Sequence, residues 1–524
     1  MIEITGHCLT IEEVLAVARQ KVQVAPLSED VCSRMLASRQ WIDEILRRDK
    51  DTVYGVNSGV GPLAAQRINP NQARALSRNL VLSCVTGIGD PLPEEIVRAM
   101  LLIRANSLAL GFSGVRPIVV NTLIEMINRG VIPYIPAKGS VGASGDLAPL
   151  AHIANILSCD PNEQDEYSGF AWFEGKLQTG AEAMKQAGIQ RLILEAKEGL
   201  SLTNGTTFMV AAGTIALSDS EMLLEQAEIS AALSIEGLLG LSAAFDPAIH
   251  LVSCQPGQIE TAARIRSLLA GSQLVDSMPE RAQDAYSLRC IPQVIGPMRD
   301  VLKFIRERIS AALNATSDNP LIISEDPSGG SFRAHYGGNF HGQGPAMWLD
   351  FLGIVMTELG SMAERRIFRL LTPELNAGLP SMLVSSSGLD SGLMISQYAA
   401  AALASDNKTL AHPDSVDSIP TSANQEDFVS MGANAARHTL EIIGNVRNIL
   451  AIEFLSACQA IDLRPDGPHR LAHRTRLAYE LVRTRVAVLE HDRALAPNIQ
   501  SLAELLASDK MTKVVLAGLT EKAV

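Results

Sequence analysis

The sequence predicts a mainly α-helical protein organised around a bundle of long helices. Largely apolar segments cover residues 206–241, 346–371 and 426–458, and such lengths are typical of buried helices rather than strands. Ala and Leu, which favour helices, are abundant, whereas aromatic residues make up only 4%. Strand signals are short and lie near residues 131–135 and 321–323. Helices that are apolar nearly all round need more cover than one subunit supplies, so we expect an oligomer.

Helix signals follow one another through the first part of the chain. Thr10 and Glu13 form a capping-box pattern, which predicts a helix start. Pro117 and Gly130 bracket another helix, because proline suits a helix start and glycine a helix end. Further helices are expected over residues 28–48, 76–84 and 93–110. Residues 54–64 contain polar and glycine positions and are interpreted as a mobile loop.

The second part of the chain is expected to be more uniformly helical. Residues 160–176 form a polar insert that we interpret as a loop, and residues 300–314 predict a helix. No repeat of 20–50 residues is visible. We expect an N-terminal domain over residues 1–200 and a long-helix domain over residues 201–524.

Charge and cysteine content bound the class of protein. A net charge of −13 and a pI near 5.3 argue against a nucleic-acid partner. A basic cluster is interpreted as a solvated helix face: Arg470, His473, Arg474 and Arg476. Seven scattered cysteines without a CxxC pair favour a reducing, cytoplasmic location. No signal peptide is evident, and the uncharged residues 199–218 are interpreted as the start of a core helix, so no membrane association is expected.

The most informative stretch runs over residues 137–152, with the sequence AKGSVGASGDLAPLAH. A glycine-rich turn leads into an apolar helix over residues 147–157, with Asp146 at the N-cap position. A phosphate-binding loop is weakly indicated, because neither GxGxxG nor GxxxxGK[ST] is present. An ordinary tight turn is a second interpretation. The third is self-modification, in which the nitrogen of Gly145 attacks the Ala143 carbonyl and Ser144 then loses its hydroxyl, leaving an electrophilic methylene.

Motifs spread over about three quarters of the chain carry a family resemblance. GSVGASGDLAPLAH resembles the signature of the histidine and aromatic amino acid ammonia-lyases. Other matching segments follow in the family's order: YGVNSGVGPLA, LTNGTT, QDAYSLRCIPQ, DNP, GGNFHG and SIPTSANQEDFVSMG. The resemblance implies a 4-methylidene-imidazol-5-one (MIO) group made from Ala143-Ser144-Gly145, with no external cofactor. It also implies a fumarase/aspartase-like superhelical architecture and a homotetramer with active sites shared between subunits.

The implied reaction removes an amine and a β-hydrogen from an α-amino acid. The Ser144-derived methylene would be the electrophile, and Tyr54 is the candidate base, although a tyrosine that merely packs is the simpler interpretation of its local sequence. Glycines after Tyr54, Gly61 among them, would let the loop close over the substrate.

Other site residues are assigned by the same resemblance. Arg289 suits the substrate carboxylate, with Gln283 nearby and with Tyr286, three residues earlier, on the same side if that stretch is helical. Asn204 would hold the ring oxygen or the carboxylate, and Phe340 would pack near the ring. Each also has a plain structural interpretation, such as a surface arginine, a turn asparagine or a core phenylalanine.

Two positions bear on the substrate. Glu426 matches the family's histidine-specific members, whereas phenylalanine- and tyrosine-specific members have an N-Q-D pattern. A glutamate at a helix N-terminus is the structural alternative. Ser83-Cys84 departs from the Ser-His pair of histidine lyases. The implied substrate is therefore histidine or a related aromatic amino acid, giving an α,β-unsaturated acid such as urocanate.

Two rival functions remain at the level of sequence. A 2,3-aminomutase on the same scaffold would return the amine to the β-carbon. An inactive scaffold protein is disfavoured by the intact Ala143-Ser144-Gly145, Tyr54 and Arg289. His469 and His473 have i, i+4 spacing, but no acidic ligand completes a metal set, so no metal is expected.

Overall fold

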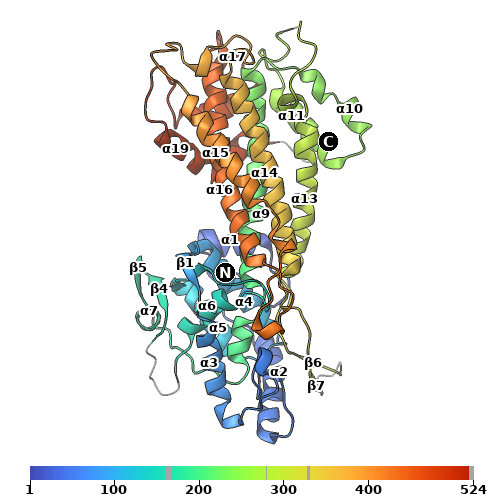
Figure 1. Ribbon diagram of the computed structural model, residues 1–524, viewed down its shortest axis with the longest axis vertical. Coiled ribbons are helices and arrows are strands. Elements are labelled where there is room, and N and C mark those ends of the chain that lie inside the picture. The colour runs from blue at the N-terminus through green and yellow to red at the C-terminus, as the bar shows by residue number, and fades with distance from the viewer. Residues whose placement is uncertain (161–166, 279, 327–330, 519–524) are drawn as a thin grey trace. The chain divides into compact units, whose positions relative to one another are not determined.

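The computed structural model describes residues 1–160, 167–278, 280–326 and 331–518 (Figure 1). The chain divides into two compact units, each assembled from stretches far apart in sequence. The first unit contains Met1–Ile215, Arg306–Asp350 and Pro413–Arg437. The second contains Ala216–Ile305, Phe351–His412 and His438–Val524. The domain boundary expected near residue 200 stays a prediction.

Short and medium helices build most of the first unit. They are α1 (Ile11–Gln20), α2 (Glu29–Arg48), α3 (Ala73–Cys84), α4 (Glu94–Ala109), α5 (Pro117–Arg129), α6 (Leu147–Leu157), α7 (Gly180–Gln186) and α8 (Glu198–Thr203). Thr10 and Glu13 form the expected capping box of α1, and Gly130 ends α5 in a left-handed conformation. Helix α4 contacts α1 and α5, while α3, α6 and α8 pack against one another. The sequence therefore predicted α1 to α6 to within a few residues, whereas α7 and α8 were not predicted.

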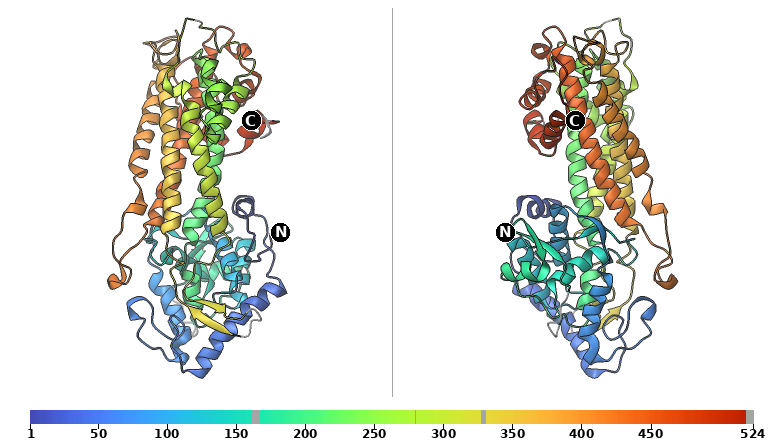
Figure 2. Two further views of the ribbon diagram at one scale, coloured as in Figure 1. Left: turned by 90° about the vertical axis from the view of Figure 1, so that its right-hand side faces the viewer. Right: turned by 60° about the vertical axis from the view of Figure 1, so that its left-hand side comes forward.

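The strands of the first unit are short and antiparallel. β1 (Ile88–Pro91) pairs with β3 (Pro136–Lys138), and β4 (Phe170–Phe173) lies between β2 (Ile132–Pro133) and β5 (Lys176–Thr179). β6 (Leu321–Ser324) and β7 (Phe332–His335) form a hairpin, shown in yellow in Figure 2. The loop expected over residues 160–176 was wrong at its end, where β4 forms because its main chain pairs with β2 on one side and with β5 on the other. Residues 161–166 of that prediction lie outside the described residues.

Long helices pass from one unit into the other along the chain: α9 (Thr207–Gly237), α13 (Ile291–Ala312), α14 (Gln343–Leu371) and α16 (Gly432–Asp462). In the second unit they lie side by side (Figures 1 and 2). The remaining helices there are α10 (Pro247–Leu251), α11 (Pro256–Leu269), α12 (Tyr286–Arg289), α15 (Met394–Leu410), α17 (Gly467–Arg470), α18 (His473–Arg483), α19 (Ala496–Leu506) and α20 (Lys510–Val515).

Several sequence expectations for these helices need correction. α13 begins nine residues before the expected start at 300, because the helix continues through Pro297. α16 begins at Gly432, not near 426, so Glu426 lies outside the helix. His469 and His473 lie on separate helices, α17 and α18, so they do not share a helix face.

The basic cluster near residue 474 is also not simply a solvated face. Its arginine side chains cap main-chain carbonyls: Arg470 that of Gln273, Arg474 those of Val515 and Ala517, and Arg476 those of His469 and Leu471. These groups therefore tie helix ends to neighbouring segments, as cationic side chains near carbonyl-rich helix ends do.

Two of the described helices, α9 and α14, are long and apolar enough to cross a membrane by length and composition alone. In the structure, 78% and 61% of their most apolar windows are buried. Burial of this extent is what the core helices of a bundle show.

A buried ion pair joins the bundle helices of the second unit. Arg366 on α14 donates to both carboxylate oxygens of Glu453 on α16, at 2.5 and 3.0 Å. Ser230 and Ser234 on α9 donate to the same carboxylate, each at 2.8 Å. Both charged side chains are fully buried. The carboxylate thus has its acceptor positions filled, which a buried charge requires.

Removing one partner of this pair should destabilise the protein. Arg366→Met leaves the Glu453 carboxylate buried without a cation, at an expected cost of about 3–5 kcal/mol. The double variant Arg366→Met/Glu453→Gln should recover much of that loss. Thermal unfolding measures both. Lys513→Gln, which breaks an exposed pair with Asp509, is the control and should change little. Equal unfolding temperatures for Arg366→Met and the wild type would contradict the prediction.

Candidate active site

The Ala143-Ser144-Gly145 turn lies against a second turn at Asn204-Gly205. Gly145 and Gly205 form a parallel bridge, in which the Asp146 N–H donates to the Gly205 carbonyl at 2.7 Å. The Gly205 N–H donates to the Ser144 carbonyl at 3.2 Å. Gly145 has a φ of +77°, and a Cβ there would lie 2.2 Å from the Gly205 oxygen. Only glycine fits at this close approach of two main chains.

The side-chain amide of Asn204 completes the contacts of the Ser144 carbonyl. With its NH₂ group toward the turn, Asn204 donates to the Ser144 oxygen at 3.0 Å and accepts from the Asn319 N–H at 2.9 Å. In the opposite orientation its oxygen would face the Ser144 oxygen, and its NH₂ group would face Asp318 Oδ1 at 3.3 Å. The first orientation satisfies both ends of the amide. Ser144 O therefore accepts two hydrogen bonds.

The other side of the turn is held by two distant segments. The Gly142 carbonyl accepts from the Gly342 N–H and from the Ser430 hydroxyl, both at 3.1 Å. Gly142 has a φ of +70°, and a Cβ there would lie 2.3 Å from Ser430 Oγ. The GGNFHG and SMG segments named in the sequence are thereby brought to the turn. Phe340 is half-buried and lies two residues before the anchored Gly342.

Glu426 contacts the serine of the turn directly. The Ser144 hydroxyl donates to Glu426 Oε1 at 2.6 Å, and the Thr421 hydroxyl donates to Oε2 at 2.8 Å. Glu426 lies in an antiparallel bridge with Thr421, six residues before α16 begins. The alternative of a glutamate placed by a helix N-terminus is therefore wrong, because Glu426 precedes the helix and points its carboxylate at Ser144.

Ser83 and Cys84 end α3. Burial raises the pKa of the Cys84 thiol; the hydrogen bond with Ser83 lowers it, and the negative charge of Glu426 raises it further. The thiol therefore lies within electrostatic range of the Glu426 carboxylate and stays protonated near neutral pH. Ser83 is exposed, and its hydroxyl donates to the Leu80 carbonyl at 2.9 Å.

The tyrosine loop reaches the same region through a short helix. The Gly61 N–H donates to the Tyr54 hydroxyl oxygen at 3.0 Å. Gly61 begins the 3₁₀ helix η1 (Gly61–Leu63), which contacts η6 (Ser422–Asn424) beside Glu426. The main chain from Gly55 to Gly59 is buried, so this loop is packed at its base. Tyr54 and Glu426 thus sit on neighbouring segments of the first unit.

Buried charges underlie the turn, and of these the sequence pattern predicted a role only for Asp146, as a helix N-cap. Asp146 occupies the N-cap position of α6, but its carboxylate accepts from the Phe208 and Met209 N–H groups at the start of α9 instead. Burial raises the pKa of Asp146 to about 7, against the lowering effects of those N–H groups and of Arg104. Burial lowers the pKa of Arg104 to about 10. A charged residue inside an apolar run, as in LLIRANSLAL, was the available signal.

Gln283, Tyr286 and Arg289 belong to the second unit. Tyr286 and Arg289 share the single turn of α12, as expected, with the guanidinium 4.8 Å from the ring centre. Tyr286 is 70% exposed, whereas Arg289 Nε is buried without a hydrogen-bond partner among the described residues. The neighbouring Asp284 accepts from the Leu241 N–H at 2.6 Å and so fixes this segment to the chain that follows α9.

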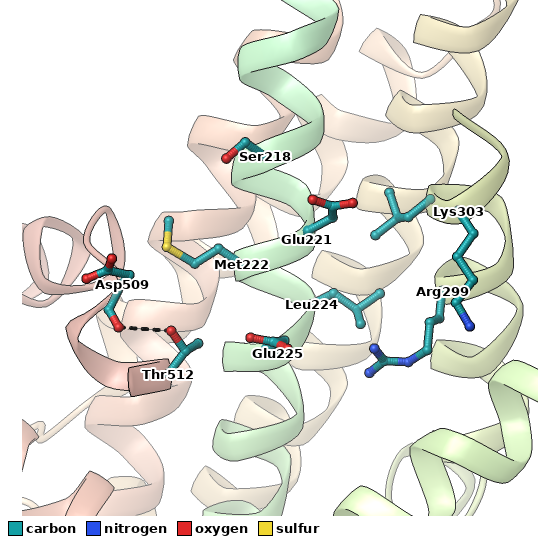
Figure 3. A pocket seen from close by; sticks show the side chains of 10 residues that line it. Ser218, Glu221, Met222, Leu224, Glu225, Arg299, Lys303, Asp509 and Thr512 are labelled. Atoms are coloured by element: carbon teal, nitrogen blue, oxygen red, sulfur yellow. Dashed lines mark hydrogen bonds between the residues drawn. The ribbon is translucent and has the colours of Figure 1, made fainter. Parts of the chain in front are cut away.

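A separate cavity of about 420 Å³ lies within the second unit (Figure 3). Its lining comes from α9, α13 and α20 and mixes acidic and basic side chains. Arg299 pairs there with Glu228 and Glu260, and Lys303 with Glu260. None of the site residues expected from the sequence lines it. Among the described residues, no group of three or more His, Cys, Asp and Glu side chains is placed to hold a metal ion.

Comparison with known proteins gives a consistent result over the whole chain. The aromatic amino acid lyase family model matches residues 9–484. A histidine ammonia-lyase from Treponema denticola is 45% identical over 97% of this chain and 97% of its own length. The structure of a Trypanosoma cruzi histidine ammonia-lyase is 37% identical, with a TM-score of 0.89 over 100% of this chain and 96% of that one. A tyrosine aminomutase from Streptomyces globisporus is 35% identical, with a TM-score of 0.90 over 98% of both chains.

The helical fold, the glycine turn and these matches define one class of enzyme, the carbon–nitrogen lyases that act on aromatic amino acids. The chain belongs to the aromatic amino acid lyase family. The resemblance stated from the sequence motifs is thereby confirmed.

A buried histidine beside the site should make stability depend on pH. Burial lowers the pKa of His152 to about 4, from its ordinary 6.5, and its Nε2 accepts from the Gly87 N–H at 3.3 Å. Between pH 6.5 and 4 the His152 imidazole binds a proton in the unfolded chain but not in the folded chain. The free energy of unfolding should therefore fall as pH falls through this window. His152→Asn should show a shallower fall of the urea unfolding midpoint. An unchanged pH dependence in that variant would contradict the assignment.

Proposed function

We propose that this protein eliminates ammonia from L-histidine, or from a related aromatic L-α-amino acid, to give an α,β-unsaturated acid, which is urocanate for histidine. One observation carries the proposal: the Ser144 hydroxyl rests on Glu426 within a turn where only glycine fits at position 145. The names of the curated relatives, histidine ammonia-lyases at 45% identity, support the same activity.

The turn fits the formation of an MIO group from its own residues. Ala143 is small and 6% exposed, Gly145 has no side chain to obstruct ring closure, and the Ser144 carbonyl accepts two hydrogen bonds. The group supplies an electrophilic methylene that takes up the substrate amine. No external cofactor is needed in this proposal.

The remaining roles follow from the positions of the side chains. Tyr54 removes the β-proton, and the Gly61 N–H, which donates to its hydroxyl oxygen, orients the phenol. Arg289 binds the substrate carboxylate through its guanidinium, which lies over the Tyr286 ring, and Gln283 assists. Phe340 packs near the turn, and Asn204 polarises the Ser144 carbonyl.

Substrate choice is assigned to Glu426 and the Ser83-Cys84 pair. A carboxylate suits an imidazole or an amine, both of which donate hydrogen bonds. Cys84 adds a protonated thiol beside that carboxylate, where a histidine would add a stronger hydrogen-bonding group.

We also propose a homotetramer with active sites shared between subunits. Tyr286 is 70% exposed in the single chain, which supports this proposal. A residue that binds substrate needs surrounding protein, and a second subunit would supply it. A cytoplasmic location stays a prediction.

A 2,3-aminomutase activity is the second candidate. The similarity to a tyrosine aminomutase structure, at 35% identity and a TM-score of 0.90, supports this second candidate. Its product differs, since the amine is found on the β-carbon.

Product analysis tests the proposed function. Purified protein incubated separately with histidine, tyrosine and phenylalanine should release ammonia and urocanate from histidine, as identified by mass spectrometry. Ser144→Ala should release none, because it lacks the hydroxyl from which the methylene forms. A β-amino acid would instead support the mutase. Turnover of no substrate, or a normal rate in Ser144→Ala, would refute the proposal.

A substitution at Cys84 tests the substrate assignment. Cys84→His should raise the ratio of kcat/KM for histidine to kcat/KM for tyrosine. The new imidazole side chain would offer the ring of a histidine substrate one more hydrogen bond, worth roughly 1 kcal/mol or about fivefold in this ratio. Cys32→His, which makes the same change at a half-buried cysteine of α2 with no role in the proposed site, is the matched control. An unchanged ratio in Cys84→His would remove this position from substrate selection.

A further inference from the structure

A lysine and an aspartate form a fully buried ion pair beneath the glycine turn. Lys197 Nζ lies 2.7 Å from Asp318 Oδ2, and the two side chains are 0% and 1% exposed. Lys197 also donates to the Ser201 hydroxyl at 2.8 Å. Neither charge takes part directly in the proposed reaction. Buried charges of this kind are costly and call for a reason.

The backbone at Lys197 has a conformation that is unfavourable for lysine. Lys197 precedes α8 with a φ of +74°, in the left-handed region that glycine adopts freely and lysine does not. A glycine would therefore suit the turn better. The presence of lysine indicates that its side chain is what the position needs.

The pair is connected to the turn by a short series of hydrogen bonds. Asp318 Oδ1 accepts from the Asn319 N–H at 2.7 Å. The same N–H lies 2.9 Å from the Asn204 side-chain oxygen, while the Asn204 NH₂ group donates to the Ser144 carbonyl at 3.0 Å. Arg104 adds a donor at 2.8 Å to the main-chain oxygen of Asn204. All these residues belong to the first unit.

The charge on Asp318 bears on which way the Asn204 amide faces. Asp318 Oδ1 lies 3.3 Å from the terminal atom of Asn204 that is turned away from Ser144. A bare carboxylate there attracts an NH₂ group and repels an oxygen. It would therefore turn the amide over and leave the Ser144 carbonyl facing an oxygen. A cation on the far carboxylate oxygen weakens this attraction.

The pKa directions agree with this arrangement. Burial raises the pKa of Asp318, but the charges of Lys197 and Arg104 outweigh it and leave the pKa below its ordinary value. Asp318 is therefore ionised, and the orientation of Asn204 depends on how well that charge is compensated.

We propose that Lys197 is a positioning residue that, by neutralising Asp318, keeps the Asn204 amide turned toward the Ser144 carbonyl. This inference rests on the proposed function, since it concerns the maturation of the Ala143-Ser144-Gly145 turn.

The chemistry identifies the step that Asn204 assists. In the first step the Gly145 nitrogen bonds to the Ala143 carbonyl carbon, whose oxygen leaves as water with the protons of the Gly145 and Ser144 nitrogens. In the second step Ser144 loses its Cα proton and its hydroxyl as water, and the electron pair of the Cα–H bond becomes the new double bond. Donors on the Ser144 carbonyl make that Cα–H more acidic, so Asn204 assists the second loss.

Intact mass of the denatured protein tests the proposal without relying on activity. The wild type should lack two waters relative to its sequence. Lys197→Met should contain severalfold less of this species and should accumulate chains that lack one water. A wild type with the full sequence mass would refute the proposed function itself. The other outcome concerns Lys197 alone. If the wild type and Lys197→Met contain the two-water-deficient species to the same extent, the role of Lys197 is overturned and the proposed function stands.

Two further variants separate positioning from loss of folding. Lys197→Met/Asp318→Asn removes both charges, so it should fold and should recover most of the two-water species. Arg98→Met is the matched control, because Arg98 is another buried cation of the first unit, with main-chain carbonyl partners at Val17 and Ile127. It should lack two waters. Circular dichroism confirms that each variant is folded.

A double-variant cycle decides whether Lys197 acts through Asn204. Asn204→Ala should slow the second loss, and adding Lys197→Met to it should slow it no further. Additive effects of the two substitutions in folded protein would show that Lys197 acts independently and would overturn the proposal. Failure of the charge-free double variant to recover would do the same.

Discussion

The close approach of two main-chain turns is the constraint on which the site depends. The Ser144–Asp146 strand segment lies on Gly205 with hydrogen bonds in both directions, and no Cβ fits at Gly145 or Gly205. At Gly205 a Cβ would lie 2.4 Å from Ser317 Oγ. Because both turns are held by hydrogen bonds and have no room to shift, Ser144 is presented with its carbonyl toward Asn204 and its hydroxyl toward Glu426. Fixed geometry of this kind is what a reacting group needs.

Charge buried around these turns follows from that constraint. The start of α9 directs main-chain N–H groups toward the turn, and Asp146 satisfies two of them. Arg104 serves the carbonyls of Ser201 and Asn204, where α8 ends. Helix ends inside a protein leave polar groups that must be paired. The site thus has more buried charge than its neutral Ala-Ser-Gly sequence suggests, because helices α6, α8 and α9 all begin or end beside it.

Local patterns were enough to predict most helices and the position of the glycine turn before α6. Helices with a cap or a proline–glycine bracket, such as α1 and α5, have boundaries that depend on neighbouring residues alone. The start of α13 was missed because Pro297 is tolerated inside it. β4 was missed although its partner β5 follows directly after Glu174 and Gly175, whose positive φ angles make a two-residue hairpin turn. The motifs named Ser144 and Glu426, but their 2.6 Å contact joins positions 282 residues apart. The pairing of Lys197 with Asp318 spans 121 residues and had no local signal. Long-range pairs of this kind are set by packing, which a single sequence does not display.

If the turn matures as proposed, the contact between Ser144 and Glu426 would link maturation to substrate binding. Before the turn is modified, each oxygen of the Glu426 carboxylate accepts from one hydroxyl, Ser144 on one side and Thr421 on the other. Loss of the Ser144 hydroxyl as water would leave Oε1 without its donor, while Thr421 continues to fix Oε2. A half-satisfied carboxylate in a partly buried site gains from a new donor. In the proposed function the imidazole or ammonium group of the substrate would supply one. The hydroxyl that would leave to form the electrophile would then occupy, until it leaves, the position at which Glu426 is proposed to bind the substrate.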